Sequence, residues 1–328
     1  ISCRYWSSDV CSSDLRLVDY IDLETSLNSS MGIRALGRLF KVNTQTVQNR
    51  IARMARQSIG LAYRLIKTLA LTEDLVSDGF ETFCLSQYYP CNINLLLGKD
   101  SKILLAADFV TPRRKGAMKE AQKQRRAQLE KFWKPDPKAL ENSYELIGRE
   151  ILSLLERRKK EHITLFTDQN PAYIRGLHRT VGLLEKMEEG VFSHVRISSK
   201  LPRTVENSLF SANYYDRELR KDQAAFVRES TRLARNADDT MNRLTVYGSY
   251  HNFKKAYRIK AEKKDPRTHG EVAGIEKEKI AAAREGYYSQ RVFFSHLALS
   301  SQEMRTWFRM WENPGKKGNK YVPYYTIS

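Results

Sequence analysis

Several features are scarce in this sequence of 328 residues. It has only four cysteines, no run of about 18 or more apolar residues, and 38 acidic against 56 basic residues. The lack of a long apolar run excludes a membrane-spanning helix and predicts a soluble, cytoplasmic protein with no membrane partner. The shortage of acids leaves a net charge of +18, which predicts a polyanionic partner, most simply nucleic acid. A ribosomal or membrane-surface protein is the alternative.

The pattern of the first fifteen residues is not typical of a folded segment. The segment YWSSDVCSSDL repeats the triplet SSD, and DVCSSDL is the translation of a common short-read sequencing adapter, so we exclude residues 1–15 from the expected fold. Two cysteines, Cys3 and Cys11, fall within it. The other two, Cys84 and Cys91, have six residues between them, which is not metal-ligand spacing. We expect both to be reduced structural thiols.

Residues 31–55 predict two short helices joined by a tight turn. Apolar residues follow helical spacing in both, and Thr44 is expected to cap the second helix. This pattern is typical of a helix-turn-helix that reads DNA, and an ordinary helical hairpin is the alternative. We expect this domain and its connector to occupy residues 16–70. The side chains expected to contact bases or phosphates are Gln45, Gln48, Asn49 and Arg53.

From residue 71 the pattern changes to strands. An antiparallel meander of three is expected over residues 75–85, 92–97 and 102–110. The first strand places Asp78 on the same face as Phe80. A basic helical insertion follows within residues 111–140, where a solvated helix is the alternative to phosphate contact. The candidates for phosphate contact at its start are Arg113, Arg114 and Lys115.

The stretch HITLFTDQNPAY predicts an apolar strand that ends at Asp168 and turns directly into a helix. Asn170 and Pro171 are residue types that begin helices. Chemistry in open α/β sheets lies beyond the carboxyl ends of the strands, so Asp168 is a candidate site residue; a turn-capping role is the alternative. Further elements are expected as a helix from Asn142 before this strand, a helix over 171–189, a strand over 193–198 and a long helix over 214–235.

A third acid, Asp216, precedes Leu219 by three residues and is therefore expected on the buried face of that long helix, with Glu218 turned to solvent. An acid favoured at a helix N-terminus by the helix dipole is the alternative. Three adjacent carboxylates need a cation, and oxygen-only ligands favour Mg²⁺ or Mn²⁺. Together, Asp78, Asp168 and Asp216 predict a metal site.

The order of these motifs resembles the RNase H-like core of DDE transposases and integrases, and of bacterial insertion-sequence transposases in particular. The resemblance is carried by SDGFETF (77–83), FTDQNPAY (166–173), DRELRKDQAAFVRES (216–230) and THGEVAGI (268–275). It implies that the three acids bind the metal ions, cut DNA at transposon ends and join the freed 3′-hydroxyl to target DNA. Many relatives have Glu-Arg where this chain has Asp216-Arg217, so Glu206 is the alternative third ligand.

The expected architecture is α/β, with an N-terminal helix-turn-helix, an RNase H-like mixed-sheet catalytic core over residues 71–260 and a C-terminal accessory tail over residues 261–328. The expected partner is double-stranded DNA, at transposon ends and target, bound by a homo-oligomer in the nucleoid. Further candidates for phosphate contact, or for plain surface charge, are Lys200, Arg220 and Lys221. The alternative function is a helix-turn-helix regulator with a non-catalytic core, which has no need for acids at strand ends.

Overall fold

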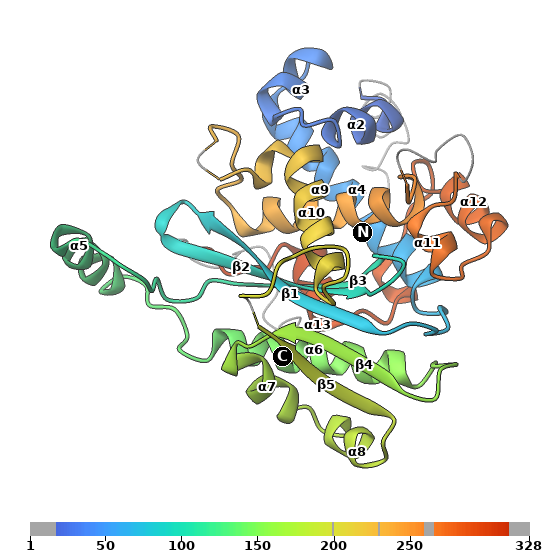
Figure 1. Cartoon of the computed structure of the whole chain (residues 1–328). Coiled ribbons are helices and arrows are strands. Elements are labelled where there is room, and N and C mark those ends of the chain that lie inside the picture. Colours follow the sequence, from blue (N-terminus) through green and yellow to red (C-terminus); the bar gives the residue numbers. More distant parts are fainter. Residues whose placement is uncertain (1–17, 199, 229, 259–265, 315–328) are drawn as a thin grey trace, which may run out of the picture.

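A computed structural model describes residues 18–198, 200–228, 230–258 and 266–314. These residues form twelve α-helices and five strands in one mixed sheet (Figure 1). The adapter-like segment lies outside the described residues. The strands are β1 (Leu75–Cys84), β2 (Ser86–Gly98), β3 (Leu104–Val110), β4 (Ile163–Asp168) and β5 (Phe192–Ile197).

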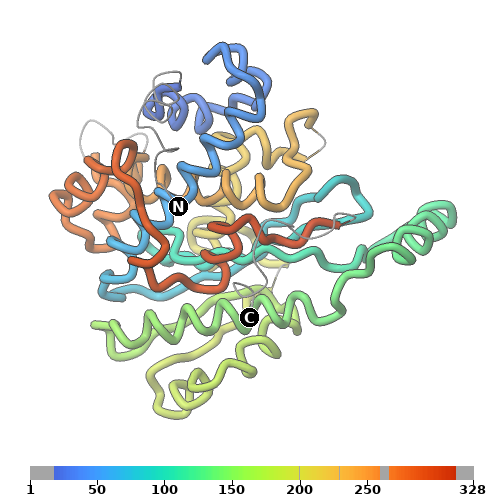
Figure 2. Tube along the Cα trace, turned by 180° about the vertical axis from the view of Figure 1, so that it is seen from behind, coloured from blue at the N-terminus to red at the C-terminus, as the bar shows by residue number. Residues whose placement is uncertain are grey.

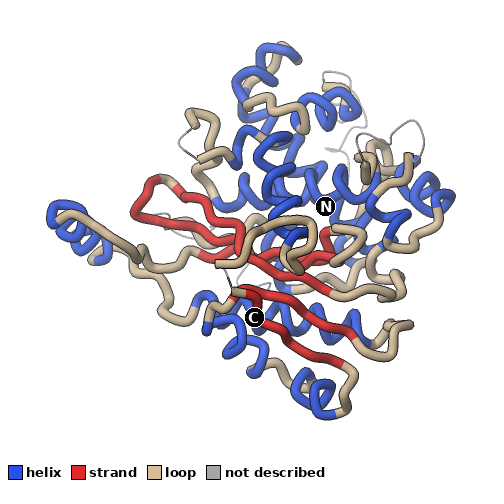
Figure 3. The backbone as a smooth tube through the Cα atoms, in the orientation of Figure 1, coloured by secondary structure: helices blue, strands red, loops and turns tan. Residues whose placement is uncertain are grey.

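The strand order across the sheet is β3-β2-β1-β4-β5. β1, β2 and β3 pair antiparallel, which confirms the expected meander, whereas β4 runs parallel to β1 and β5 runs parallel to β4. β2 begins earlier than predicted because Leu85, at φ 65°, turns the chain within one residue. The α/β class is confirmed, and the strands form one continuous band through the middle of the molecule (Figure 3).

Helices cover both faces of the sheet. One face packs on α9 (Phe210–Asp222) and α10 (Ala237–Phe253), with Phe80 and Tyr215 in its core. The other face packs on α6 (Ala139–Leu155), α7 (Pro171–His178) and α8 (Leu183–Glu188). Because both faces are covered, β2 is buried without alternation from Cys91 to Gly98, although its successive side chains point to opposite faces.

The N-terminal helices stack on the α10 side of the sheet. They are α2 (Tyr20–Leu27), α3 (Ile33–Leu39) and α4 (Thr44–Leu65), and α4 packs along α10. Seen from behind, the C-terminal helices lie beside α4 (Figure 2). These C-terminal elements are α11 (His269–Val272), α12 (Lys277–Glu285) and α13 (Ser301–Phe308). In the part of the chain that the structure describes, no helix combines the length and the apolar character needed to cross a membrane.

Helix α5 (Glu120–Glu130) stands apart from the body, on an extended arm between β3 and α6 (Figure 1). None of its residues is buried. Its sequence, EAQKQRRAQLE, has few apolar side chains to bury, so the helix relies on local contacts such as the Arg113 to Glu130 pair at 2.7 Å. The expected basic helical insertion is therefore present as a helix with all sides exposed.

Two expected helices are interrupted. The helix predicted over 171–189 is broken into α7 and α8 by Gly182, whose φ of 85° lies in the left-handed region. Val181, beside this glycine, is 88% exposed. The helix predicted over 214–235 begins four residues earlier and ends at Asp222, because Gln223 is extended; the next residues form a single 3-10 turn, η2 (Ala224–Phe226).

Several local assignments also need correction. Asn43, not Thr44, caps α4, since its side chain accepts a hydrogen bond from the Gln45 backbone at 2.9 Å. α6 begins at Ala139, and Asn142 instead donates to Asp136. At α4 the neighbouring residues Asn43 and Thr44 both have a side chain able to cap a helix, whereas α6 begins after Lys138 without a side-chain cap.

Candidate active site

Asp78 and Asp168 come from neighbouring strands. The parallel register pairs Leu75 with Leu165 and Val76 with Phe166, so two residues further along the strands the two acids lie side by side on one face. Strand β4 ends at Asp168, whereas β1 continues beyond Asp78. The acids therefore stand where the sheet opens at the carboxyl end of β4, as the sequence predicted for Asp168.

Each of these acids uses one carboxylate oxygen locally. Asp78 Oδ1 accepts a hydrogen bond from the Gly79 backbone at 2.8 Å, and Asp168 Oδ1 accepts one from the Asn170 backbone at 2.9 Å. Asn170 in turn caps α7, with Pro171 at the start of the helix, as predicted. Asp168 thus also has the turn-stabilising role that was its alternative interpretation. The two roles are compatible, because a carboxylate has a second oxygen for another partner.

The pKa of Asp78 is affected by the negative charge of the neighbouring Asp168. Burial, helped by the negative charge of Asp168 and opposed by the hydrogen bond from Gly79, raises the pKa of Asp78 to about 6. The guanidinium of Arg203, in the loop after β5, lies 3.6 Å from Asp78 Oδ2 and opposes the increase. A half-buried carboxylate beside a second carboxylate is stabilised by a cation, and Arg203 supplies one positive charge here.

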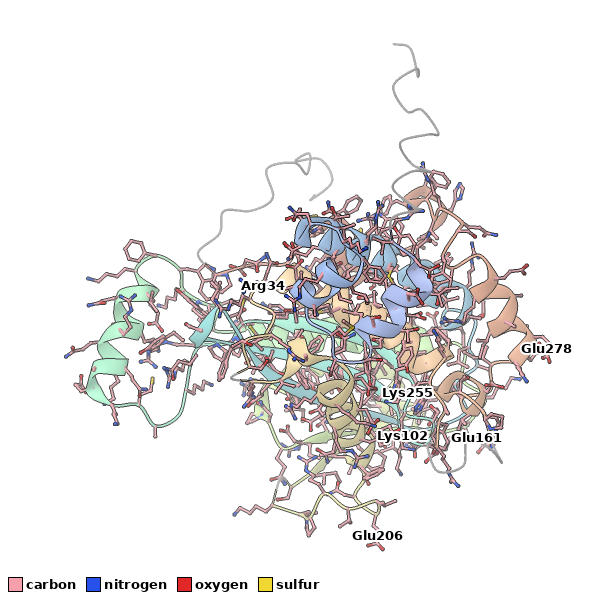
Figure 4. All side chains as sticks on the ribbon, turned by 90° about the horizontal axis from the view of Figure 1, so that it is seen from above. Arg34, Lys102, Glu161, Glu206, Lys255 and Glu278 are labelled. Atoms are coloured by element: carbon pink, nitrogen blue, oxygen red, sulfur yellow. The ribbon has the colours of Figure 1, made fainter. Side chains whose placement is uncertain are left out.

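Asp216 on α9 is the third acid to reach this point. Burial raises its pKa to about 7, and the next contribution is the charge of Asp78, which places the two carboxylates within electrostatic range. Arg220, Arg203 and Arg228 lower it. The alternative ligand Glu206 is exposed, and Figure 4 shows it at the outer end of the loop between β5 and α9. The structure thus brings Asp216, not Glu206, near Asp78.

Glu218 contradicts the expectation that it faces solvent. It is 3% exposed, and it accepts a hydrogen bond from Lys255 at 2.6 Å. Lys255 also binds Asp222 at the end of α9. The long helix was expected to have a single buried face, but α9 packs against the sheet on one side and against Lys255, after α10, on another.

The acids open into a cleft of about 550 Å³ with a basic rim. Asp78 and Asp168 line it, together with residues at the base of the α5 arm and after η2: Arg113, Arg114, Lys115 and Arg228. Arg228 donates to the backbone oxygen of Glu81 at 2.9 and 2.6 Å, on the stretch of β1 that extends past β4. A concave site with carboxylates at the base and guanidinium groups at the rim suits a phosphodiester, whose negative charge the rim attracts.

Sequence reasoning missed two groups in this cleft. Arg228 was assigned to a helix that ends before it, so its contact with β1 could not be foreseen. Asn92 lies in the cleft with its amide oxygen buried and without a hydrogen-bond partner among the described residues. Its side chain occupies the space over Gly79, where an added Cβ would come within 2.3 Å of its Oδ1. The only sequence signal was a glycine inside a strand, which often marks such a close approach.

The remaining predicted DNA contacts are spread over several surfaces. In α4, Gln45 and Asn49 are exposed and bonded to each other at 3.1 Å, whereas Gln48 binds Asp239 of α10 and Arg53 lies over the Tyr20 ring. Arg220 lies 4.5 Å over the Phe80 ring, Lys221 pairs with Glu218 at 3.5 Å and Lys200 is exposed.

The helices α3 and α4 are joined by a four-residue turn, residues 40–43, in which Lys41 has a φ of 54°. The lack of a side chain on Gly37 lets the two helices approach, because an added Cβ would lie 3.0 Å from the Val42 carbonyl oxygen. Cys84 and Cys91 are buried in the sheet core and form no disulfide. The predicted structural role of these two thiols is consistent with this position.

A divalent cation suits the donor set of the three acids, since carboxylate oxygens are the ligands that Mg²⁺ and Mn²⁺ prefer. In the described residues, no three acidic, histidine or cysteine side chains converge closely enough to form a complete metal site. Arg203 is the cation that the structure places among them, 3.6 Å from Asp78. Comparison with models of known protein families gave no match, and no curated protein sequence matched the chain.

Proposed function

We propose that this chain is a DDE-type DNA transposase with an RNase H-like catalytic core. The observation that carries the proposal is the register that sets Asp78 of β1 beside Asp168 of β4 at the open end of a mixed sheet, with Asp216 of a later helix within electrostatic range of Asp78. The strand order β3-β2-β1-β4-β5, with an antiparallel meander followed by two parallel strands, is compatible with that core. The resemblance of the four sequence motifs points to the same class.

Asp78, Asp168 and Asp216 would hold Mg²⁺ or Mn²⁺. When bound, such ions activate a water or a 3′-hydroxyl and stabilise the leaving oxygen in phosphodiester chemistry. The chain's own basic residues would hold the DNA backbone: Arg203 and Arg228 beside the acids, and Arg113 and Lys115 at the cleft rim. Arg203, now paired with Asp78, would exchange that carboxylate for a phosphate when DNA enters.

The partner in this proposal is double-stranded DNA, both at the transposon ends and at the target, in the nucleoid. The α3–α4 hairpin would act as a helix-turn-helix in which Gln45 and Asn49 reach base edges, since these two are the exposed amides of α4. Two DNA ends must be cut and joined, which favours a homo-oligomer. The net charge of +18 supports binding to a polyanion.

The test uses the full chain and a DNA duplex copied from the genomic DNA that flanks its reading frame. We expect Mg²⁺-dependent strand cleavage at the transposon end within this duplex, followed by joining of the cut strand to a plasmid. Asp78→Ala and Asp168→Ala should each lower the rate of cleavage by roughly 100-fold or more. Loss of a residue that only hydrogen-bonds to a metal ligand can already lower activity by up to about 100-fold. DNA binding by both variants should persist.

The outcome separates three classes of protein. Specific DNA binding with no cleavage by the unmodified chain under any divalent ion would identify the regulator. Cleavage without joining would identify a plain nuclease. Undiminished cleavage by either variant would overturn the assignment of that acid to the site.

A further inference from the structure

A second cavity, of about 320 Å³, lies at the β3 edge of the sheet and shares no lining residue with the acid cleft. It is enclosed by β3, the first turns of α6, the end of the α5 arm and the segment after α13. The polar and aromatic side chains that line it include Asp108, Trp133, Asp136, Arg305, Trp311 and Glu312. Three carboxylates against one guanidinium make this cavity acidic in a strongly basic chain.

Asp108 is the unusual group in this cavity. Its side chain is 1% exposed, and neither carboxylate oxygen has a hydrogen-bond partner among the described residues. The nearest positive charge, Arg305 Nη1, is 3.7 Å from Oδ1, which is too far for a hydrogen bond. Burial raises the pKa of Asp108 to about 6, and the Ser143 hydroxyl, Arg305 and the Phe109 backbone N–H oppose the increase, although none of them makes a hydrogen bond of normal length and angle to the carboxylate. A buried charge without donors is costly, which implies an additional partner.

The other acids of the cavity already have structural partners. Asp136 accepts hydrogen bonds from the Lys138 backbone at 2.9 Å and from Asn142 at 2.7 Å. Glu312 accepts one from the Trp133 indole at 2.8 Å, which ties the end of the α5 arm to the C-terminal segment. These contacts hold the walls in place, and they leave Asp108 as the group whose hydrogen-bonding capacity is unused.

The cavity selects the chemistry of its ligand. A phosphate is excluded by the three carboxylates, and the described residues offer no set of three close ligands for a metal ion. Trp133 and Trp311 supply aromatic surface, which attracts organic cations. The two free oxygens of Asp108 need N–H donors, and a primary ammonium group carries three.

We propose that this cavity binds a primary alkylammonium group, carried by a polyamine or by a lysine side chain, with Asp108 as its anchoring carboxylate. The ammonium group would donate to both Asp108 oxygens, and its alkyl chain would lie against the tryptophan rings. Arg305 competes for Asp108, so it would move away from that carboxylate on binding.

The test is calorimetric titration of the full, nuclease-treated chain at pH 7.5 with four probes: butylamine, tetramethylammonium, spermidine and an N-acetyl-lysine amide. We expect saturable binding of butylamine and none of tetramethylammonium, which has the charge but no N–H donor. Non-specific attraction of a cation is weak here because the chain itself is cationic. Spermidine and the lysine amide distinguish the two sources, and binding of either one supports an ammonium site.

Two variants link the binding to this cavity. Asp108→Asn should weaken butylamine binding by at least about ten-fold, whereas the matched Asp100→Asn, at an exposed acid in the β2–β3 turn, should not. Arg305→Met leaves Asp108 intact and should tighten binding by removing its competitor. Failure of all amines to bind the unmodified chain, or equal binding of tetramethylammonium, would overturn the proposal. So would a loosening of binding by Arg305→Met in a chain with normal thermal stability.

Discussion

At the scale of single residues, the candidate active site depends on the environment of its acids. Asp78 and Asp216 both have a raised pKa, to about 6 and about 7, because burial and a neighbouring carboxylate disfavour their charged forms. Such shifts occur at functional sites, where charges are held together before a ligand compensates them. Structural ion pairs also perturb pKa values, so the roles of the acids have to be tested one by one.

Two variants test which residue is the third metal ligand. We expect Asp216→Asn to lower Mg²⁺-dependent cleavage by roughly 100-fold or more while Glu206→Gln leaves it unchanged, because Asp216 lies beside Asp78 and Glu206 is exposed. Initial rates of cleavage on a labelled duplex measure the effect. The opposite ranking would show that Glu206 is the third ligand and that its loop folds inward when DNA binds.

At the scale of elements, α9 is held against the sheet by contacts far from the acids. Lys255, which follows α10, binds Glu218 and Asp222 on α9. Below it, His251 and His269 stack with ring centroids 3.8 Å apart. His251 lies 3.0 Å from the Lys102 carbonyl oxygen and His269 lies 2.7 Å from that of Ser101, so each donates an N–H to the turn between β2 and β3. His251 therefore has a packing role.

This histidine pair predicts acid instability. Burial lowers the pKa of His269 from 6.5 to about 4, and it also lowers the pKa of His251 well below its usual value. The unfolded chain then binds more protons than the folded chain between pH 6.5 and pH 4, so stability falls as the pH is lowered through this window. His269 alone should account for roughly 3 kcal/mol of that loss.

Urea unfolding at pH values from 4 to 7.5 measures this dependence. His269→Gln should flatten the curve over the same window, and the matched His296→Gln, at an exposed histidine, should not. An unchanged slope in His269→Gln would show that the stacked pair does not control the acid transition.

At the scale of the whole molecule, buried ion pairs join the N-terminal helices to the rest of the chain. Glu24 of α2 is fully buried and binds Lys254 at 2.9 Å, Arg284 at 3.1 Å and Tyr288 at 2.6 Å. Its partners follow α10 or belong to the C-terminal region, so segments more than 200 residues apart meet at one carboxylate. These contacts attach α2 to the segments that follow α10 and to the C-terminal region.

Removal of Glu24 should destabilise the protein more than removal of an exposed acid. We expect Glu24→Ala to lower the free energy of unfolding by about 3 kcal/mol, because it leaves the partly buried Arg284 guanidinium without its buried carboxylate and removes the hydrogen bond from Tyr288. Glu276→Ala, which breaks an exposed pair with Lys279 at 3.1 Å, should cost no more than about 1 kcal/mol. Denaturant unfolding of both variants checks the difference, and similar losses would contradict this role of Glu24.

The net charge gives a second prediction at this scale. Binding of duplex DNA should weaken steeply between about 50 and 200 mM salt, since each phosphate contact releases a counterion. A Lys115→Gln, Lys123→Gln, Arg125→Gln variant of the α5 arm should lower the log–log salt slope by about one for each phosphate contact that the substitutions remove. The matched double substitution Lys277→Gln, Lys279→Gln on α12 should leave it unchanged. An unaltered slope in the arm variant would mean that α5 does not touch DNA.

The sequence by itself determined the pieces of the candidate site. The apolar run that ends at Asp168, the capping pair Asn170 and Pro171, and the alternation around Asp78 are set by neighbours within a few residues, and the structure has each of them. The antiparallel meander follows from the same local patterns and short turns. These features could be predicted because strand alternation and helix capping act over short distances.

Only the tertiary structure decided how the pieces meet. The end of α9 at Asp222, the burial of Glu218 against Lys255 and the contact of Arg228 with β1 depend on residues far away in the chain. The choice of Asp216 over Glu206 rests on the same packing, because α9 places Asp216 near Asp78 while Glu206 is exposed in the preceding loop. Burial and charge in a folded protein are set by segments that a local pattern does not contain, and they determine which carboxylates share one site.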